Sequence, residues 1–194
     1  MFGDPEIQGG DAEELAAHFV RVWAEAVIRQ AIRTREVRKR SELDDLAWER
    51  NDNWTLTASD LDSNWRRLWA EEHTLVWSAY QLERWQARLA KERGVAAPEE
   101  NEPLRRARNA LEHLDELHLE DYAATVPADV SPKAARRMAI SGFPEQMLSF
   151  TGSVAAEVLD PETLDREAMK VVGAIEDELD ERAAAAYLDY VRGR

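Results

Sequence analysis

The feature that most constrains this fold is a long apolar seam between residues 59 and 94. Its members recur at steps of about 3.5 to 4 residues, the spacing that aligns side chains along one face of an α-helix: Leu61, Trp65, Leu68, Leu75, Ala79, Leu82 and Leu89. Gly94 follows the seam at a position where helices commonly end. Other aromatic residues fall on other faces of this helix, so we expect neighbouring helices to cover more than one of its sides.

The residues before the seam predict two helices. Asp11 and Glu14 form a capping-box pattern at the start of the first helix, which we expect to run to about residue 40. A short second helix is expected to begin at Ser41, with a loop after it. Residues 1–10 contain three glycines and predict a loose arm.

The residues after the seam predict two further helices. Asn101 is a suitable cap for a helix over 102–122, and its short connection to the seam helix implies an antiparallel hairpin. The stretches RMAIS and QMLSFTG predict a short β-hairpin, and Pro161 opens the last helix. We therefore expect an all-α, up-and-down four-helix bundle in one domain, residues 1–194, with a short β-hairpin before the last helix.

Composition narrows the classes of function. The net charge of −14 argues mildly against a general nucleic-acid binder. The absence of cysteine excludes disulfides, thiolate metal sites and thiol catalysis. No apolar stretch approaches the roughly 20 residues of a membrane helix, and the N-terminus lacks a secretory signal pattern. We expect a cytoplasmic protein with no membrane partner.

The segment RNALEH, residues 108–113, bears most directly on function. Arg108 lies on the flank of its predicted helix, roughly 75° from the core side, and His113 lies roughly 145° from it with Asn109 alongside. Ala110 and Leu117 share the side of His113, which indicates that another part of the chain or another subunit covers it. The core side itself is expected to carry Leu104, Ala107, Leu111, Leu114 and His118.

Each of these polar residues also has an ordinary structural interpretation. Arg108 can pair with Glu112 one turn away, an interaction worth about a few tenths of a kcal/mol, and His113 can be a plain surface histidine. His118 is expected to be a hydrogen-bonded core histidine. Glu72 falls within the apolar seam, so we expect it to pair with an arginine of a facing helix or to line a site.

Other side chains that could bind a ligand have ordinary interpretations too. The seven tryptophans are expected to pack in the core or at a subunit interface rather than to stack on bases. The basic run from Arg29 to Arg40 is expected to be a solvated helix end, with contact to RNA or an acidic partner as the alternative. Glu72, His73 and His113 lack the repeated Glu-x-x-His of carboxylate-bridged bundles, so we expect no metal site.

On the second helix of the predicted hairpin, an arginine is followed directly by an asparagine, and a histidine lies four residues after the asparagine. This pattern resembles the signature of the HEPN superfamily. Arg108, Asn109 and His113 fit that signature. The stretch RLWAEEHTLVWSAYQLERWQARL is similar to the helix that pairs with the HEPN motif helix. The resemblance covers residues 60–125, and outside them only the number of helices agrees. It implies a four-helix bundle that is commonly a homodimer, with the two motif helices meeting at the interface.

The resemblance also implies an activity. Many HEPN proteins are metal-independent endoribonucleases of toxin–antitoxin or other prokaryotic defence systems. In that scheme His113 is the general acid or base, Arg108 holds the scissile phosphate, and Asn109 orients His113 or the phosphate by hydrogen bonding. The scheme needs no cofactor. Its partners are an RNA substrate and, in toxin systems, a nucleotidyltransferase-type antitoxin that modifies a tyrosine two residues after the histidine, where this chain has Asp115.

A different class of function fits the same residues. HEPN folds without catalytic activity exist, and a non-catalytic helical module would dimerise or dock a partner through its tryptophan-rich surface and the face around His113. Glu112, Asp115 and Glu116 surround the motif with negative charge, which disfavours an RNA phosphate. A small-molecule-binding bundle is a third alternative. The sequence alone therefore leaves open whether the protein is an enzyme.

Overall fold

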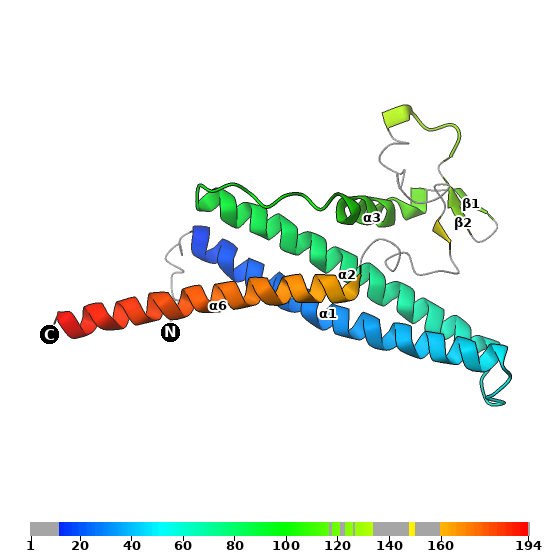
Figure 1. The fold of residues 1–194 in the computed structure, drawn as a ribbon. Helices are drawn as coiled ribbons and strands as arrows, with labels where there is room; N and C mark the ends of the chain where they lie inside the picture. The colour runs from blue at the N-terminus through cyan, green and yellow to red at the C-terminus, as the bar shows by residue number, and fades with distance from the viewer. Residues whose placement is uncertain are drawn as a thin grey trace, which may run out of the picture.

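The fold is mostly helical, as the sequence predicts (Figure 1). The computed structural model describes residues 12–116, 118–120, 123–125, 127–133, 148–149 and 160–193. These residues form helices α1 (Ala12–Glu49), α2 (Ala58–Glu92), α3 (Glu102–Glu112) and α6 (Pro161–Arg192), a 3-10 turn (Leu114–Glu116), and strands β1 (His118–Glu120), β2 (Ala123–Thr125) and β3 (Leu148–Ser149). None of the described helices is both long enough and apolar enough to cross a membrane.

Helix α1 is longer than predicted. The expected break at Ser41 is wrong: Ser41 is buried within one continuous helix, nearer its C-terminal end. No glycine or proline interrupts residues 12–49, and buried Asp44 accepts a hydrogen bond from Asn64 Nδ2 at 2.8 Å, which ties this part of α1 to α2. The chain turns after α1 through Asn51, whose φ of 55° is in the left-handed region that asparagine tolerates. The predicted cap Asp11 and the arm over residues 1–10 lie outside the described residues.

Helix α2 has strong local signals at both ends. Thr57 and Asp60 form a reciprocal capping box, so the helix begins at Ala58, slightly before the start at Ser59 or Asp60 that the sequence predicts. At the other end Gly94 adopts a φ of 65°, and Gly94 N and Val95 N donate to the carbonyls of Lys91 and Ala90 at 3.2 and 3.0 Å. This pair of hydrogen bonds is a Schellman motif, and it confirms the predicted stop at Gly94.

Helix α3 begins as predicted but ends early. Asn101 Oδ1 accepts a hydrogen bond from Leu104 N at 3.0 Å, as expected for the cap. The predicted extension to residue 122 is wrong, because the backbone leaves the helix at His113 and forms a 3-10 turn and then β1. His118 consequently lies exposed on β1 and is not a core histidine.

The small sheet differs from the predicted hairpin. Its strands follow the order β1-β2-β3 and are antiparallel, with Ala124 opposite both Leu119 and Leu148. Strand β3 falls within the predicted strand QMLSFTG, but its described neighbour is β2. The other predicted strand, RMAIS, lies outside the described residues.

The core lies between α1 and α2 and includes buried side chains of α3 and α6, which pack on them (Figure 1). Helices α1 and α2 form a long antiparallel hairpin, α6 packs on α1, and α3 packs on α2. Small residues of α1, such as Ala24 and Ala31, are fully buried in this core. The seam is buried from Leu75 to Leu89, whereas Leu61, Trp65 and Leu68 near the hairpin tip are only half-buried.

Candidate functional site

Arg108 of α3 packs its guanidinium against two aromatic side chains of α2. Its Cζ lies 4.6 Å from the centroid of the Tyr80 ring and 6.0 Å from that of Trp77. A guanidinium over an aromatic face is attracted by the negative face of the ring. The side chain is only 23% exposed, so Arg108 contributes to the α2–α3 contact as well as to any chemistry at the surface.

The polar atoms of Arg108 also have partners on α3. Nη1 donates to Asn109 Oδ1 at 2.9 Å, and Nη2 forms an ion pair with Glu112. Its buried Nε has no hydrogen-bond partner among the described residues. The ion pair with Glu112 is the ordinary interpretation of the sequence, and Asn109 is oriented toward the arginine.

His113 caps the C-terminal end of α3. Its backbone N–H donates to the carbonyl of Asn109 at 3.2 Å, and its half-buried ring places Nδ1 2.8 Å from Glu116 Oε1. An ionised carboxylate can only accept a hydrogen bond, so this contact favours the tautomer with the proton on Nδ1. Nε2 is then the nitrogen that can accept a proton.

The arginines around the motif are compensated by carboxylates. Arg105 pairs with Glu100 at 3.1 Å, and Arg106 pairs with Glu102 at 2.7 Å. Exposed Asp115 adds a negative charge that has no ion-pair partner among the described side chains. The end of α3 is therefore not a basic surface, in agreement with the acidic surroundings noted in the sequence.

The basic run of α1 is also largely neutralised within the fold. Four of its cations have carboxylate partners, and in the described structure only Arg33 and Lys39 of this run form no ion pair. The pairs are Arg29–Glu25, Arg35–Asp165, Arg38–Glu72 and Arg40–Asp44. This arrangement matches a structural helix surface more closely than an RNA-binding stripe.

Glu72 lies almost fully buried between α1 and α2. Arg38 Nη2 approaches its Oε1 to 2.7 Å, which confirms the expected pairing with an arginine of a facing helix. Burial lowers the pKa of the neighbouring His73, whose ring meets Trp69 edge-on at 6.5 Å. In the part of the chain that is described, no three metal-ligating side chains lie close enough together to hold an ion.

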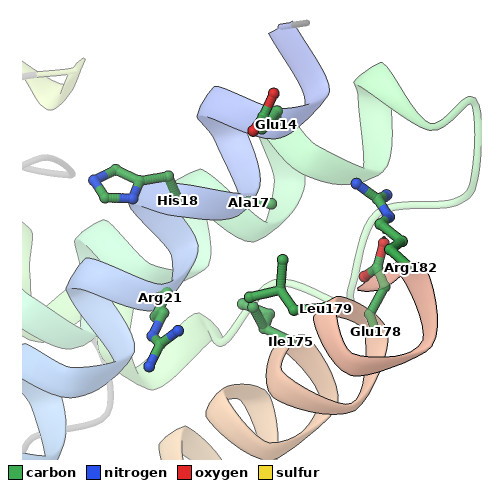
Figure 2. A pocket seen from close by; sticks show the side chains of 8 residues that line it. All are labelled: Glu14, Ala17, His18, Arg21, Ile175, Glu178, Leu179 and Arg182. Atoms are coloured by element: carbon green, nitrogen blue, oxygen red, sulfur yellow. Dashed lines mark hydrogen bonds and ion pairs between the residues drawn. The ribbon is translucent and has the colours of Figure 1, made fainter. Parts of the chain in front are cut away.

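A shallow groove lies between the start of α1 and the second half of α6 (Figure 2). Its apolar wall is formed by Ala17, Ile175 and Leu179. Its cations are compensated, because Arg21 pairs with Glu176 at 3.1 Å and Arg182 with Glu178 at 2.6 Å. The groove thus offers apolar surface but no unpaired charge from its arginines.

The sequence placed Arg108, Asn109 and His113 on one segment, and the fold brings the first two into direct contact. The contacts with Tyr80 and with Glu116 could not be read from helical spacing, because the first joins two helices and the second needs the chain to leave the helix at His113. The predicted stripe through Ala110 and Leu117 involves side chains outside those described. Three tryptophans are exposed rather than buried, including Trp54 at 91% in the α1–α2 connection.

No protein-family model matches the chain, and no curated protein or solved structure matches it either.

Proposed function

We propose that the chain is a HEPN-like four-helix protein that cleaves or binds RNA without a metal, within a prokaryotic toxin–antitoxin or defence system. The observation that best supports the proposal is the contact between His113 Nδ1 and Glu116, which orients the ring and leaves Nε2 as its basic nitrogen. The same pairing of a carboxylate with an imidazole stabilises the positive charge that forms when a general base takes up a proton.

The proposed step is an attack within the RNA. Nε2 of His113 accepts the proton of a ribose 2′-hydroxyl, and the 2′-oxygen forms a bond to phosphorus. The bond from phosphorus to the 5′-oxygen breaks, and that oxygen takes a proton from water. The products are a 2′,3′-cyclic phosphate and a 5′-hydroxyl, and no electrons are exchanged with another molecule.

Arg108 is the proposed phosphate ligand. Tyr80 holds its guanidinium in place, and a phosphate can replace Glu112 as the partner of Nη2. Asn109 keeps Nη1 oriented through the 2.9 Å hydrogen bond. Because an RNA phosphate has to replace the Glu112 carboxylate, we expect RNA binding to depend on ionic strength and on the charge at residue 112.

The test is RNA cleavage in EDTA, with His113→Ala and the control His18→Ala. His18 is an exposed histidine on α1, so its replacement removes an imidazole without touching α3. We expect the wild type to cut RNA and His113→Ala to cut it about 10²- to 10⁴-fold more slowly. His18→Ala should cut RNA at the wild-type rate. Equal cleavage by wild type and His113→Ala would rule out the assigned role.

A second candidate function is a non-catalytic interaction module. It is favoured by exposed apolar side chains at two places, the tip of the α1–α2 hairpin with Trp48 and Trp54, and the end of α6. The ion pairs of Arg105, Arg106 and Arg108 with carboxylates also favour this function, because they leave these arginines less available to an RNA phosphate. A wild type that neither cuts nor binds a panel of RNAs, yet forms a stable complex with a protein such as a nucleotidyltransferase-type antitoxin, would favour this function.

A further inference from the structure

The last turns of α6 have no cover among the described residues. Every residue from Glu181 to Gly193 is exposed, and the last buried side chain of the helix is Ile175. Figure 1 shows this end of α6, drawn in red, extending past the other described helices. Among its large side chains, Tyr187 is 66% exposed and Val191 50% exposed.

An uncovered helical end of this composition is unusual in water. Isolated helices shorter than about 12 to 15 residues are marginal even when rich in alanine, and helices gain most of their stability from packing an apolar face. On a helical wheel Ala184, Tyr187 and Val191 fall within roughly 60° of one another, and Leu188 flanks them. The spacing 184, 187, 191 is the alternation of three and four residues that lines the contact between paired helices.

We propose that this face is the contact between two copies of the chain, with their α6 ends antiparallel about a two-fold axis. When Ala184 lies opposite the partner's Tyr187, Tyr187 lies opposite the partner's Ala184, so each large side chain meets a small one. The axis then passes at the level of Ala185 and Ala186 along the helix, and the small side chain of Ala184 lets the backbones come close.

The charges at the edge of this face fit the same arrangement. Glu181 and Arg192 lie on one edge of the helix, and neither forms an ion pair within the described structure. Antiparallel pairing brings this edge of one helix against the same edge of the other. Arg192 then reaches Glu181 of the partner subunit, and symmetry repeats the pair. A surface whose shape and charge both complement themselves favours a second copy over an unrelated partner.

The size of the contact predicts a modest affinity. The large side chains present on the order of several hundred Å² per copy, so the pair buries on the order of 1,000 Å². This area is at the lower end of specific interfaces, where dissociation constants in the micromolar range are common. The contact is independent of the proposed RNA chemistry, because it lies on α6 and involves no residue of α3.

The experiment is sedimentation equilibrium of the full chain at protein concentrations of roughly 1 to 100 μM. Ala184→Glu places a charge on the proposed contact, whereas Ala186→Glu places the same charge about 160° around the helix, away from both the contact and the edge of Glu181 and Arg192. Both alanines are exposed, so neither change disturbs the core, and circular dichroism verifies the fold. We expect a reversible wild-type dimer, a dissociation constant raised at least tenfold by Ala184→Glu, and little change with Ala186→Glu.

The charge pair offers a second check. Glu181→Arg and Arg192→Glu should each weaken the dimer several-fold, and the double exchange should restore it. A wild type that stays monomeric at every concentration would overturn the proposal, as would equal effects of the two alanine variants. RNA cleavage by Ala184→Glu is measured separately, so a failure of the dimer and a failure of the nuclease are distinguishable.

Discussion

The guanidinium of Arg108 lies over the ring of Tyr80, with Cζ 4.6 Å from the ring centroid. This contact joins α3 to α2 and holds the first residue of the RNALEH motif in place. Arg108 therefore has a structural role whether or not it binds phosphate, and its variants need a stability measurement beside every activity measurement.

The contact between Arg108 and Tyr80 should appear as a coupling energy. In a double-mutant cycle with Arg108→Ala and Tyr80→Leu, we expect a coupling of about 0.5 to 1 kcal/mol from urea denaturation. Arg84 is the matched control, because it is more exposed and its Cζ lies 6.0 Å from the same ring. If Arg84→Ala couples to Tyr80 as strongly as Arg108→Ala does, the contact has no special role in joining the helices.

The buried pair between Arg38 and Glu72 should matter more than the exposed ion pairs of α1. Arg38→Met removes the partner of a carboxylate that is only 3% exposed, and we expect a loss of about 2 to 3 kcal/mol of unfolding free energy. Arg29→Met removes an exposed cation paired at 3.6 Å and should cost less than about 0.5 kcal/mol. Equal losses in the two variants, measured by chemical denaturation, would contradict this assignment.

Helix boundaries with local signals could be predicted, and those decided by tertiary contacts could not. Gly94, Asn101 and Pro161 each mark an end through their own backbone or side-chain chemistry, and all three predictions hold. Ser41 looked like a cap in isolation, but packing against α2 keeps the helix continuous there. No glycine or proline marks the end of α3 at Glu112. The helix ends there because the chain turns into a small sheet, which the local sequence does not indicate.

The candidate site could be predicted as a set of residues but not as a set of contacts. Helical spacing identified the pairing of Arg108 with Glu112, since both lie on one helix. The approach of His113 Nδ1 to Glu116 depends on the backbone geometry after the helix ends, which spacing does not describe. The partner of Glu72 could be predicted by residue type, because a buried carboxylate requires a cation, but not by number.

Burial of His73 predicts a pH dependence of stability. Desolvation lowers the pKa of this imidazole below its ordinary value near 6.5, so the unfolded chain binds the proton at a higher pH than the folded chain does. The contribution of His73 to stability is complete above about pH 6.5 and is lost as the pH falls from there through the lowered pKa. His73→Gln should flatten the change in unfolding free energy over this window, whereas His18→Gln should leave it in place.

Burial of Glu83 predicts a pH dependence of stability opposite in direction to that of His73. Desolvation raises its pKa, although the hydrogen bond from Asn101 N at 3.3 Å opposes the shift. The stabilising contribution of the protonated form is present below the ordinary pKa of glutamate and is lost as the pH rises through the raised value. Glu83→Gln should therefore stabilise the protein at pH 7 by less than about 1 kcal/mol, since the side chain is partly solvated. A gain that persists unchanged at about pH 4 would contradict this explanation.

The proposed RNA chemistry is tested most directly by the ends of the products. An RNA is incubated with the wild-type protein in EDTA, beside the same RNA with 2′-O-methyl groups at every position, and the fragments are analysed by mass spectrometry. The proposal predicts 2′,3′-cyclic phosphate and 5′-hydroxyl ends from the first RNA, no cleavage of the second, and no cleavage of either by His113→Ala. Cleavage of the methylated RNA, 5′-phosphate ends, or no cleavage of any RNA tried would contradict it.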